Sequence, residues 1–70
     1  MFTLKIGKLL SQDFSSVKDA SNAYQDLRDE LGLGASEFPS GNLRNKETRV
    51  AFKISYNGRV WDSSNNEVAL

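Results

Sequence analysis

The segment Ser16–Leu33, SVKDASNAYQDLRDELGL, is the best-specified part of this chain and predicts an amphipathic helix. Its apolar residues recur at steps of three and four, which places them along one side of a helix with 3.6 residues per turn. These residues are Val17, Ala20, Tyr24, Leu27 and Leu31. Ser16 is suited to cap the first turn, with Asp19 three residues later completing a capping box. Gly32 is expected to end the helix in the left-handed conformation, so the rest of the chain must cover one apolar stripe.

The N-terminus predicts a half-buried strand that faces this helix. Apolar and polar residues alternate there, and the inward side chains are Phe2, Leu4 and Ile6. Gly7 interrupts the alternation: a bulge at this glycine would turn Leu9 inward, and without a bulge Leu10 continues the pattern. Residues 11–13 read as a polar connection, after which Phe14 fills the gap where the helix begins.

A second alternating run, residues 47–56, predicts a strand that continues into a hairpin. Val50, Phe52 and Ile54 are expected on its inner face. Asn57-Gly58 is typical of a two-residue type I′ loop. With that loop Trp61 lies in the core beside Ile54, and Arg59 lies across Tyr56. A three-residue loop would turn Trp61 outward instead.

Between the helix and this hairpin, residues 34–45 have no clear period and contain two glycines and the single proline. They are interpreted as a long loop. Its centre, Glu37, Phe38 and Pro39, is the candidate recognition loop, with the alternative that Phe38 only closes the core.

The order of these elements predicts an α+β domain of the type β-α-β-β. One amphipathic helix packs on one face of a three-stranded sheet that has a C-terminal β-hairpin. Residues 1–62 form this single domain, and residues 63–70 form a polar, flexible tail. The strand order stays open: the first strand lies parallel to the second with a right-handed crossover, or antiparallel to the third.

The composition argues against catalysis and against a metal or disulfide site. The chain of 70 residues has no histidine and no cysteine, the side chains used most often as bases, nucleophiles and zinc ligands near neutral pH. We therefore expect no enzyme, no cofactor and no metal. Asp26, Asp29 and Glu30 share one side of the helix but are interpreted as a solvated face. The N-terminus has neither a signal peptide nor a membrane span, which predicts a cytoplasmic protein without a membrane partner.

The charges sum to zero but are separated along the sequence. From Asp13 to Glu37 there are six acidic and two basic residues, a net charge of −4. From Arg44 to Trp61 there are five basic and one acidic residue, a net charge of +4. An acidic helix side and a basic sheet side are expected. The residues predicted to form the basic surface are Lys5, Arg49, Lys53 and Arg59.

This basic surface suits either of two kinds of partner. It can follow a phosphate backbone, although the predicted register places no aromatic side chain on it to stack bases. Alternatively it meets an acidic protein surface, including the helix side of another copy. The sequence favours a non-enzymatic binding module acting through protein–protein interaction, with a protein partner or with itself. Nucleic-acid binding is the alternative.

Several motifs resemble small uncharacterised bacterial proteins of the phage and mobile-element accessory type. They are Ala23-Tyr24, Arg28-Asp29, GLGASEFPSG at residues 32–41 and YNGRVW at residues 56–61. The resemblance covers about half of the chain, from the helix onward. It implies an accessory or regulatory binding role, and no activity, cofactor or catalytic residue.

Overall fold

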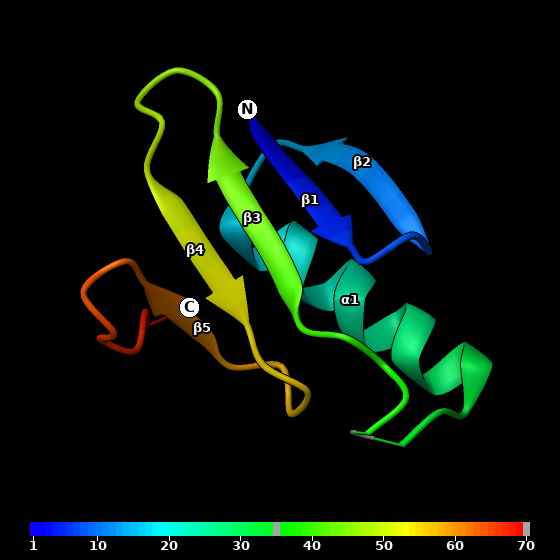
Figure 1. Ribbon diagram of the computed structural model, residues 1–70. Coiled ribbons are helices and arrows are strands. Elements are labelled where there is room, and N and C mark those ends of the chain that lie inside the picture. Colours follow the sequence, from blue (N-terminus) through cyan, green and yellow to red (C-terminus); the bar gives the residue numbers. More distant parts are fainter. Residues whose placement is uncertain (35, 70) are drawn as a thin grey trace.

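The computed structural model describes residues 1–34 and 36–69 as one helix packed on one face of a five-stranded antiparallel sheet (Figure 1). In chain order the elements are β1 (Phe2–Ile6), β2 (Leu10–Phe14), α1 (Val17–Leu31), β3 (Gly41–Asn45), β4 (Ala51–Ile54) and β5 (Val60–Asp62). In the sheet the strands follow the order β2-β1-β3-β4-β5. The α+β class with a single helix is confirmed.

The three-stranded sheet was wrong, because two short strands lie in segments that read as connections. Residues 10–14 pair with β1 as the strand β2, although three of their five residues are polar. Residues 41–45, predicted as loop, form the central strand β3 between β1 and β4. All four strand pairings are antiparallel, and β1 lies between β2 and β3. Both expected pairings of the first strand, parallel to the strand that is now β4 or antiparallel to the one that is now β5, were therefore wrong.

One face of the sheet carries the core, and its side chains follow the pleat. In the register of the sheet, Leu4 lies opposite Leu43, and Ile54 lies opposite Val60. The inward direction of the N-terminal strand is confirmed, since Leu4 and Ile6 are fully buried. The buried apolar residues of the described chain are Leu4, Ile6, Ala20, Tyr24, Phe38, Leu43, Ile54 and Val60.

The helix begins and ends at the residues its sequence predicts, although the Asp19 carboxylate accepts from the Ser15 hydroxyl at 3.2 Å rather than from the Ser16 amide of the expected capping box. The Asp19 amide donates to Ser16 Oγ at 3.1 Å, and Gly32 has a φ of 65° with its N–H donating to the Arg28 carbonyl at 3.0 Å. Its predicted stripe is correct except at the last turn. Ala20 and Tyr24 are buried, but Leu31 is 44% exposed because it lies beyond the edge of the sheet's core.

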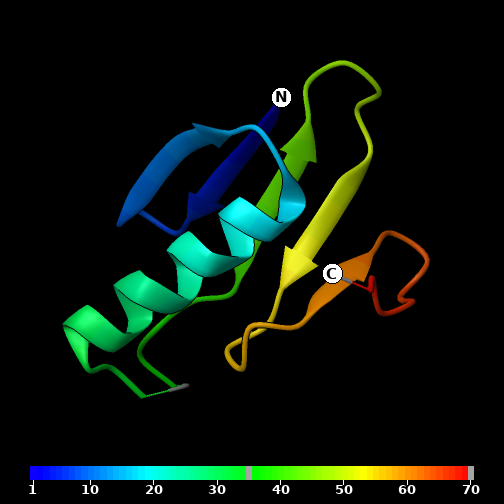
Figure 2. The ribbon, with the colours of Figure 1, turned by 180° about the vertical axis from the view of Figure 1, so that it is seen from behind.

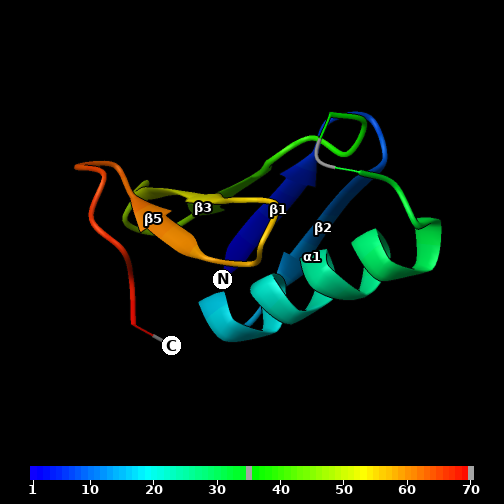
Figure 3. The ribbon, with the colours of Figure 1, turned by 90° about the horizontal axis from the view of Figure 1, so that it is seen from below.

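The helix covers only part of one face. It packs against β1, β2 and β3 and leaves β4 and β5 beside it, as seen from the helix side in Figure 2. Figure 3 shows the two layers edge-on, with α1 below the sheet. Within residues 1–34 and 36–69, no second helix lies over the opposite face.

Tyr24 is the side chain that joins helix, sheet and long loop. Its ring lies against Gly41 of β3, where an added Cβ would be 3.1 Å from both Tyr24 Cδ2 and Leu4 Cδ1. Its ring centroid is 5.0 Å from that of Phe38, and its hydroxyl donates to the Pro39 carbonyl at 3.0 Å. Burial raises the pKa of Tyr24, so the hydroxyl stays protonated as a donor.

The β4–β5 hairpin has a three-residue loop, and the predicted two-residue loop was wrong. The Gly58 amide donates to the Ser55 carbonyl, and the Ser55 amide donates to the Arg59 carbonyl. Gly58 has a φ of 89°, so Tyr56-Asn57-Gly58 forms a turn that closes with a glycine of positive φ. The extra residue shifts the register by one, and Trp61 therefore pairs with Lys53 on the face away from the core.

The C-terminal segment returns along β5. Asp62 Oδ1 accepts from the amides of Ser64 and Asn66, and this turn brings Glu67 opposite Trp61. The Val68 amide donates to the Val60 carbonyl at 2.8 Å, and its side chain packs against the core. Of the predicted tail, Leu70 lies outside the described residues.

Gly41→Ala is expected to lower the free energy of unfolding by about 1–3 kcal/mol, because the new methyl group would crowd Tyr24 and Leu4 in a packed core. Urea denaturation measures this change. Gly34→Ala is the matched control, since no atom lies within 4 Å of its added Cβ, and its effect should stay within about 0.5 kcal/mol. Equal effects of the two substitutions would show that Tyr24 does not require the close approach at Gly41.

Candidate functional site

The face of the sheet away from α1 carries two cross-strand rows of outward side chains. We call it the open face. The first row, from β5 to β2, is Trp61, Lys53, Asn42, Lys5 and Ser11. The second row, from β4 to β2, is Ala51, Arg44, Thr3 and Asp13. Each row follows from the register, because directly opposed residues of an antiparallel sheet point to the same side.

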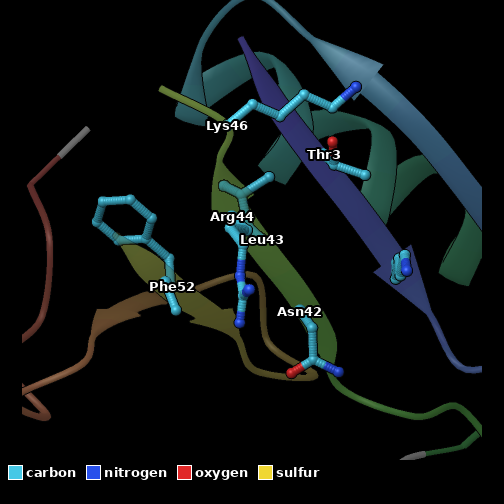
Figure 4. A pocket seen from close by; sticks show the side chains of 8 residues that line it. Thr3, Asn42, Leu43, Arg44, Lys46 and Phe52 are labelled. Atoms are coloured by element: carbon cyan, nitrogen blue, oxygen red, sulfur yellow. The ribbon is translucent and has the colours of Figure 1, made fainter. Parts of the chain in front are cut away.

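A shallow hollow of about 600 Å³ lies on the open face above β1, β3 and β4. Figure 4 shows Thr3, Asn42 and Arg44 along it, with the Lys46 side chain crossing from the end of β3 toward β2. Lys5 also lines the hollow. A surface of this shape, broad and cationic, suits an extended anionic ligand better than a small enclosed one.

Three cations of the open face are not neutralised by the protein. Lys5, Arg44 and Lys53 are exposed, and none forms an ion pair or side-chain hydrogen bond with a residue in 1–34 or 36–69. Two other cations at the margins do have partners. Lys46 Nζ lies 2.8 Å from Asp13 Oδ2, and Arg59 lies 3.6 Å from Glu67.

The Asp13 carboxylate is held at the β2 margin of the face. Hydrogen bonds from Lys46 and from the Thr3 hydroxyl, at 2.8 Å each, favour its charged form and lower the pKa of Asp13. From Trp61 to Ser11 the first row contains no carboxylate. Two acids flank the face: Asp13, which binds Lys46, and Glu67, which lies opposite Trp61 and pairs with Arg59.

Two of the four residues predicted for the basic surface lie on the open face. Lys5 and Lys53 stand in the same row, separated by Asn42. Arg49 does not lie on a strand: it belongs to the loop between β3 and β4, with a φ of 61°, because Asn45 Oδ1 accepts from the amides of Glu47 and Thr48 and starts a turn there. Val50 in the same loop is 42% exposed, contrary to its predicted inward position.

Arg59 lies at the hairpin end, beside Glu67 rather than across Tyr56. The cation over the Tyr56 ring is Arg28 of the helix, whose guanidinium carbon is 5.4 Å from the ring centroid. Arg28 also donates to the Tyr56 carbonyl at 2.6 Å, so this arginine ties the hairpin loop to the helix. The expected Arg59–Tyr56 contact was therefore wrong.

In the candidate recognition loop the central residue, Phe38, is buried, and its two neighbours are exposed. Phe38 is 2% exposed and packs between the rings of Tyr24 and Tyr56, with centroid distances of 5.0 and 6.5 Å. Glu37 and Pro39 remain exposed on either side of it. Phe38 therefore closes the core, and recognition by the exposed Glu37 and Pro39 stays a prediction.

Sequence reasoning missed Arg44, Asn42 and the outward position of Trp61. Arg44 and Asn42 lie on β3, whose single large apolar residue, Leu43, gives too weak a period to predict a strand. Trp61 was assigned to the core through the two-residue loop. A glycine at the third loop position is also typical of three-residue hairpins. The Asn57-Gly58 motif is therefore compatible with both the two-residue loop, which places Trp61 in the core, and the three-residue loop, which turns it outward.

The described residues contain no cluster of three or more aspartate, glutamate, histidine or cysteine side chains arranged to hold a metal ion. None of the helices in the described part of the chain is long and apolar enough to cross a membrane.

Comparisons of the chain with protein-family models, with curated proteins and with solved structures find no match.

Lys46→Gln is expected to raise the pKa of Asp13 toward its ordinary value, because Lys46 is the largest cause of its lowering. NMR titration of the Asp13 carboxyl carbon measures this. Since the folded-state pKa lies below the unfolded value, the pair stabilises the protein above the ordinary aspartate pKa, and that contribution is lost as pH falls through the folded-state value. Lys8→Gln, the same change in the β1–β2 turn, should leave this titration in place, and an equal shift in both variants would contradict the assignment.

Proposed function

We propose that the open face binds the phosphate backbone of a nucleic acid. The observation that carries this proposal is the set of unpaired cations, Lys5, Arg44 and Lys53, on one sheet face that also presents Trp61. Lysine and arginine supply the sequence-independent part of nucleic-acid binding, and an aromatic ring beside them supplies a contact for bases. The predicted register placed no aromatic side chain on the basic surface, which was the main argument against nucleic-acid binding. The outward position of Trp61 supplies that aromatic side chain.

The positions of the cations support a role beyond edge protection. Lysine on an edge strand blocks strand pairing between molecules. Lys5 and Lys53, however, lie on β1 and β4, which are interior strands with a neighbour on each side. Protection of an edge therefore does not account for them.

A net charge of zero does not prevent this binding. The exposed acids of the helix, including Asp19, Asp26 and Asp29, lie on the other layer of the molecule. Packed layers are about 10 Å apart, which is close to the Debye length of about 8 Å at physiological salt. A ligand on the open face is therefore screened from the acids of the helix but not from the three cations beneath it.

The expected affinity is modest. Three phosphate contacts give a slope of about −2 to −3 in a plot of log K against log salt. Non-specific binding of this kind has dissociation constants of roughly 10⁻⁴ to 10⁻⁶ M at physiological salt. The open face therefore suits a module that acts together with other binding sites, or at high local concentration.

Docking of a protein partner, including a second copy, is the second candidate, favoured by the opposite charges of the two faces. The acidic and basic sides lie on opposite layers, so copies that meet through them associate head to tail. Such contacts form rings or open filaments rather than simple two-fold dimers. A mass that rises with concentration in light scattering, and falls with salt, would support this candidate over nucleic-acid binding.

Lys53→Gln is expected to weaken binding to a labelled oligonucleotide and to reduce the salt slope by about 0.7 to 0.9, because one phosphate contact is lost. Fluorescence anisotropy at several salt concentrations measures both. Lys18→Gln is the matched control: it changes the net charge equally, but Lys18 is an exposed residue of α1. If both variants weaken binding equally, only the net charge matters and the open face is not the site.

Asp13→Asn is expected to tighten binding roughly two- to fivefold at low salt, because it removes a carboxylate from the margin of the open face and frees Lys46 for phosphate. The same anisotropy titration measures the change. Asp26→Asn removes an equal charge from the exposed side of the helix and should leave the affinity nearly unchanged. Tighter binding by Asp26→Asn, or none by Asp13→Asn, would contradict this placement of the ligand.

A further inference from the structure

We infer that the nucleic acid bound here is single-stranded, and that an unpaired base stacks on Trp61. This inference rests on the proposed function and specifies its ligand. It depends on how Trp61 is held, on the hollow beside it, and on the row of side chains that leads away from it.

Contacts with the helix hold Trp61 outward. The position of its ring is set by the hairpin register, and the hairpin loop is fixed from behind at two carbonyls. The buried Ser21 hydroxyl donates to the Gly58 carbonyl at 2.9 Å, and Arg28 donates to the Tyr56 carbonyl at 2.6 Å. The Tyr56 hydroxyl donates to the Leu33 carbonyl at 2.6 Å. A register slip that returned Trp61 to the core would break these bonds, so the ring is in place before a ligand arrives.

A hollow of about 270 Å³ lies beside the ring and is lined by Lys53, Ser55, Trp61 and Asn65. It is smaller than the usual range of about 300–1,000 Å³ for drug-sized ligands, which suits a single planar group. Its chemistry is mixed: an aromatic ring, one cation and two neutral polar groups. This combination matches a nucleotide, which presents an aromatic base, a phosphate charge and polar base edges.

The polar side chains of this hollow differ in whether they are free to form hydrogen bonds with a ligand. The Ser55 hydroxyl is occupied, since it donates within the hairpin to Asn57 and Arg59. The Asn65 amide forms no side-chain hydrogen bond with any residue in the described ranges, although its backbone is fixed by a bond from its N–H to the Asp62 carbonyl at 3.0 Å. Asn65 and Lys53 are therefore the free polar groups beside the ring, one for a base edge and one for a phosphate.

The strand path runs along the first row. From Trp61 the row continues through Lys53 and Asn42 to Lys5, three strand spacings away, or about 14 Å. No carboxylate lies between Trp61 and Lys5, and Glu67, opposite Trp61 at the end of the row, pairs with Arg59 at 3.6 Å. A single strand whose base occupies the hollow can place its following phosphates over Lys53 and Lys5.

A duplex cannot use this arrangement as it stands. Its bases are paired and stacked inside the helix, and one must leave the stack to meet a side chain face to face. Only the phosphate contacts remain for a duplex, whereas a single strand gains the stacking contact as well. The open face is therefore expected to prefer single strands.

The test compares an oligothymidylate of about 8 nucleotides with a duplex of equal length. Trp61 is the single tryptophan of the chain, so the emission comes from this ring, which lines the hollow beside Lys53 and Asn65 and a second one beside Arg28 and Tyr56. We expect the wild type to bind the single strand more tightly, with a change in Trp61 emission. Trp61→Leu, which keeps an apolar side chain without a ring, should weaken single-strand binding about five- to tenfold and leave duplex binding and the salt slope unchanged. Trp61→Phe, which keeps a ring and controls for folding, should retain most of the affinity.

The outcomes separate this inference from the function on which it rests. If the wild type binds both ligands with the expected salt slope and Trp61→Leu binds like the wild type, the stacking inference fails and the phosphate interface stands. Equal weakening of both ligands by Trp61→Leu also overturns it. If neither oligonucleotide binds at low salt, the proposed function fails, and a protein partner becomes the better explanation of the cationic face.

Discussion

The packing of Tyr24 against Gly41 is the contact on which the arrangement of this protein depends. It places α1 across β1, β2 and β3, and it brings the long loop into the core through Phe38 and the Pro39 carbonyl. A bulkier residue at position 41 would lift the helix from the central strand. Within residues 1–34 and 36–69, the helix α1 covers one face of the sheet and no second helix covers the other.

The helix and β1 could be predicted because their own residues show a clear period or caps. The strands β2 and β3 could not, because they depend on pairing with a neighbouring strand. The helix has a regular stripe, a serine cap and a terminating glycine, and all three lie where the sequence places them. β1 alternates clearly. β2 and β3 have too few apolar residues to show a period, and they become strands because β1 offers each of them a partner. In this protein the residues of β2 and β3 form strands because they pair with β1, and not because their own sequences favour a strand.

The same division applies to the candidate site. Lys5 and Lys53 were found because they lie on the two strands whose alternation is visible in the sequence. Arg44 required knowledge of β3. Trp61 required the hairpin register, which depends on one additional loop residue and on the helix contacts of Ser21 and Arg28 with that loop. A shift of one residue moved the single tryptophan from the core to the cationic face, and with it the relative weight of the two functions that the sequence allowed.

The open face carries its cations without acids between them. An exposed antiparallel sheet is stabilised when oppositely charged side chains face each other across strands, and it is destabilised when like charges are directly opposite each other. The row Lys53, Asn42, Lys5 contains two cations and no acid, although the chain has nine acidic residues to place. The one carboxylate of the strand rows, Asp13, lies at the β2 margin and already binds Lys46. In the register of the sheet Lys53 faces Trp61 and Asn42, and Lys5 faces Asn42 and Ser11, so the two cations neither oppose each other nor face an acid across the strands. The proposal of phosphate contacts rests on this unpaired positive charge.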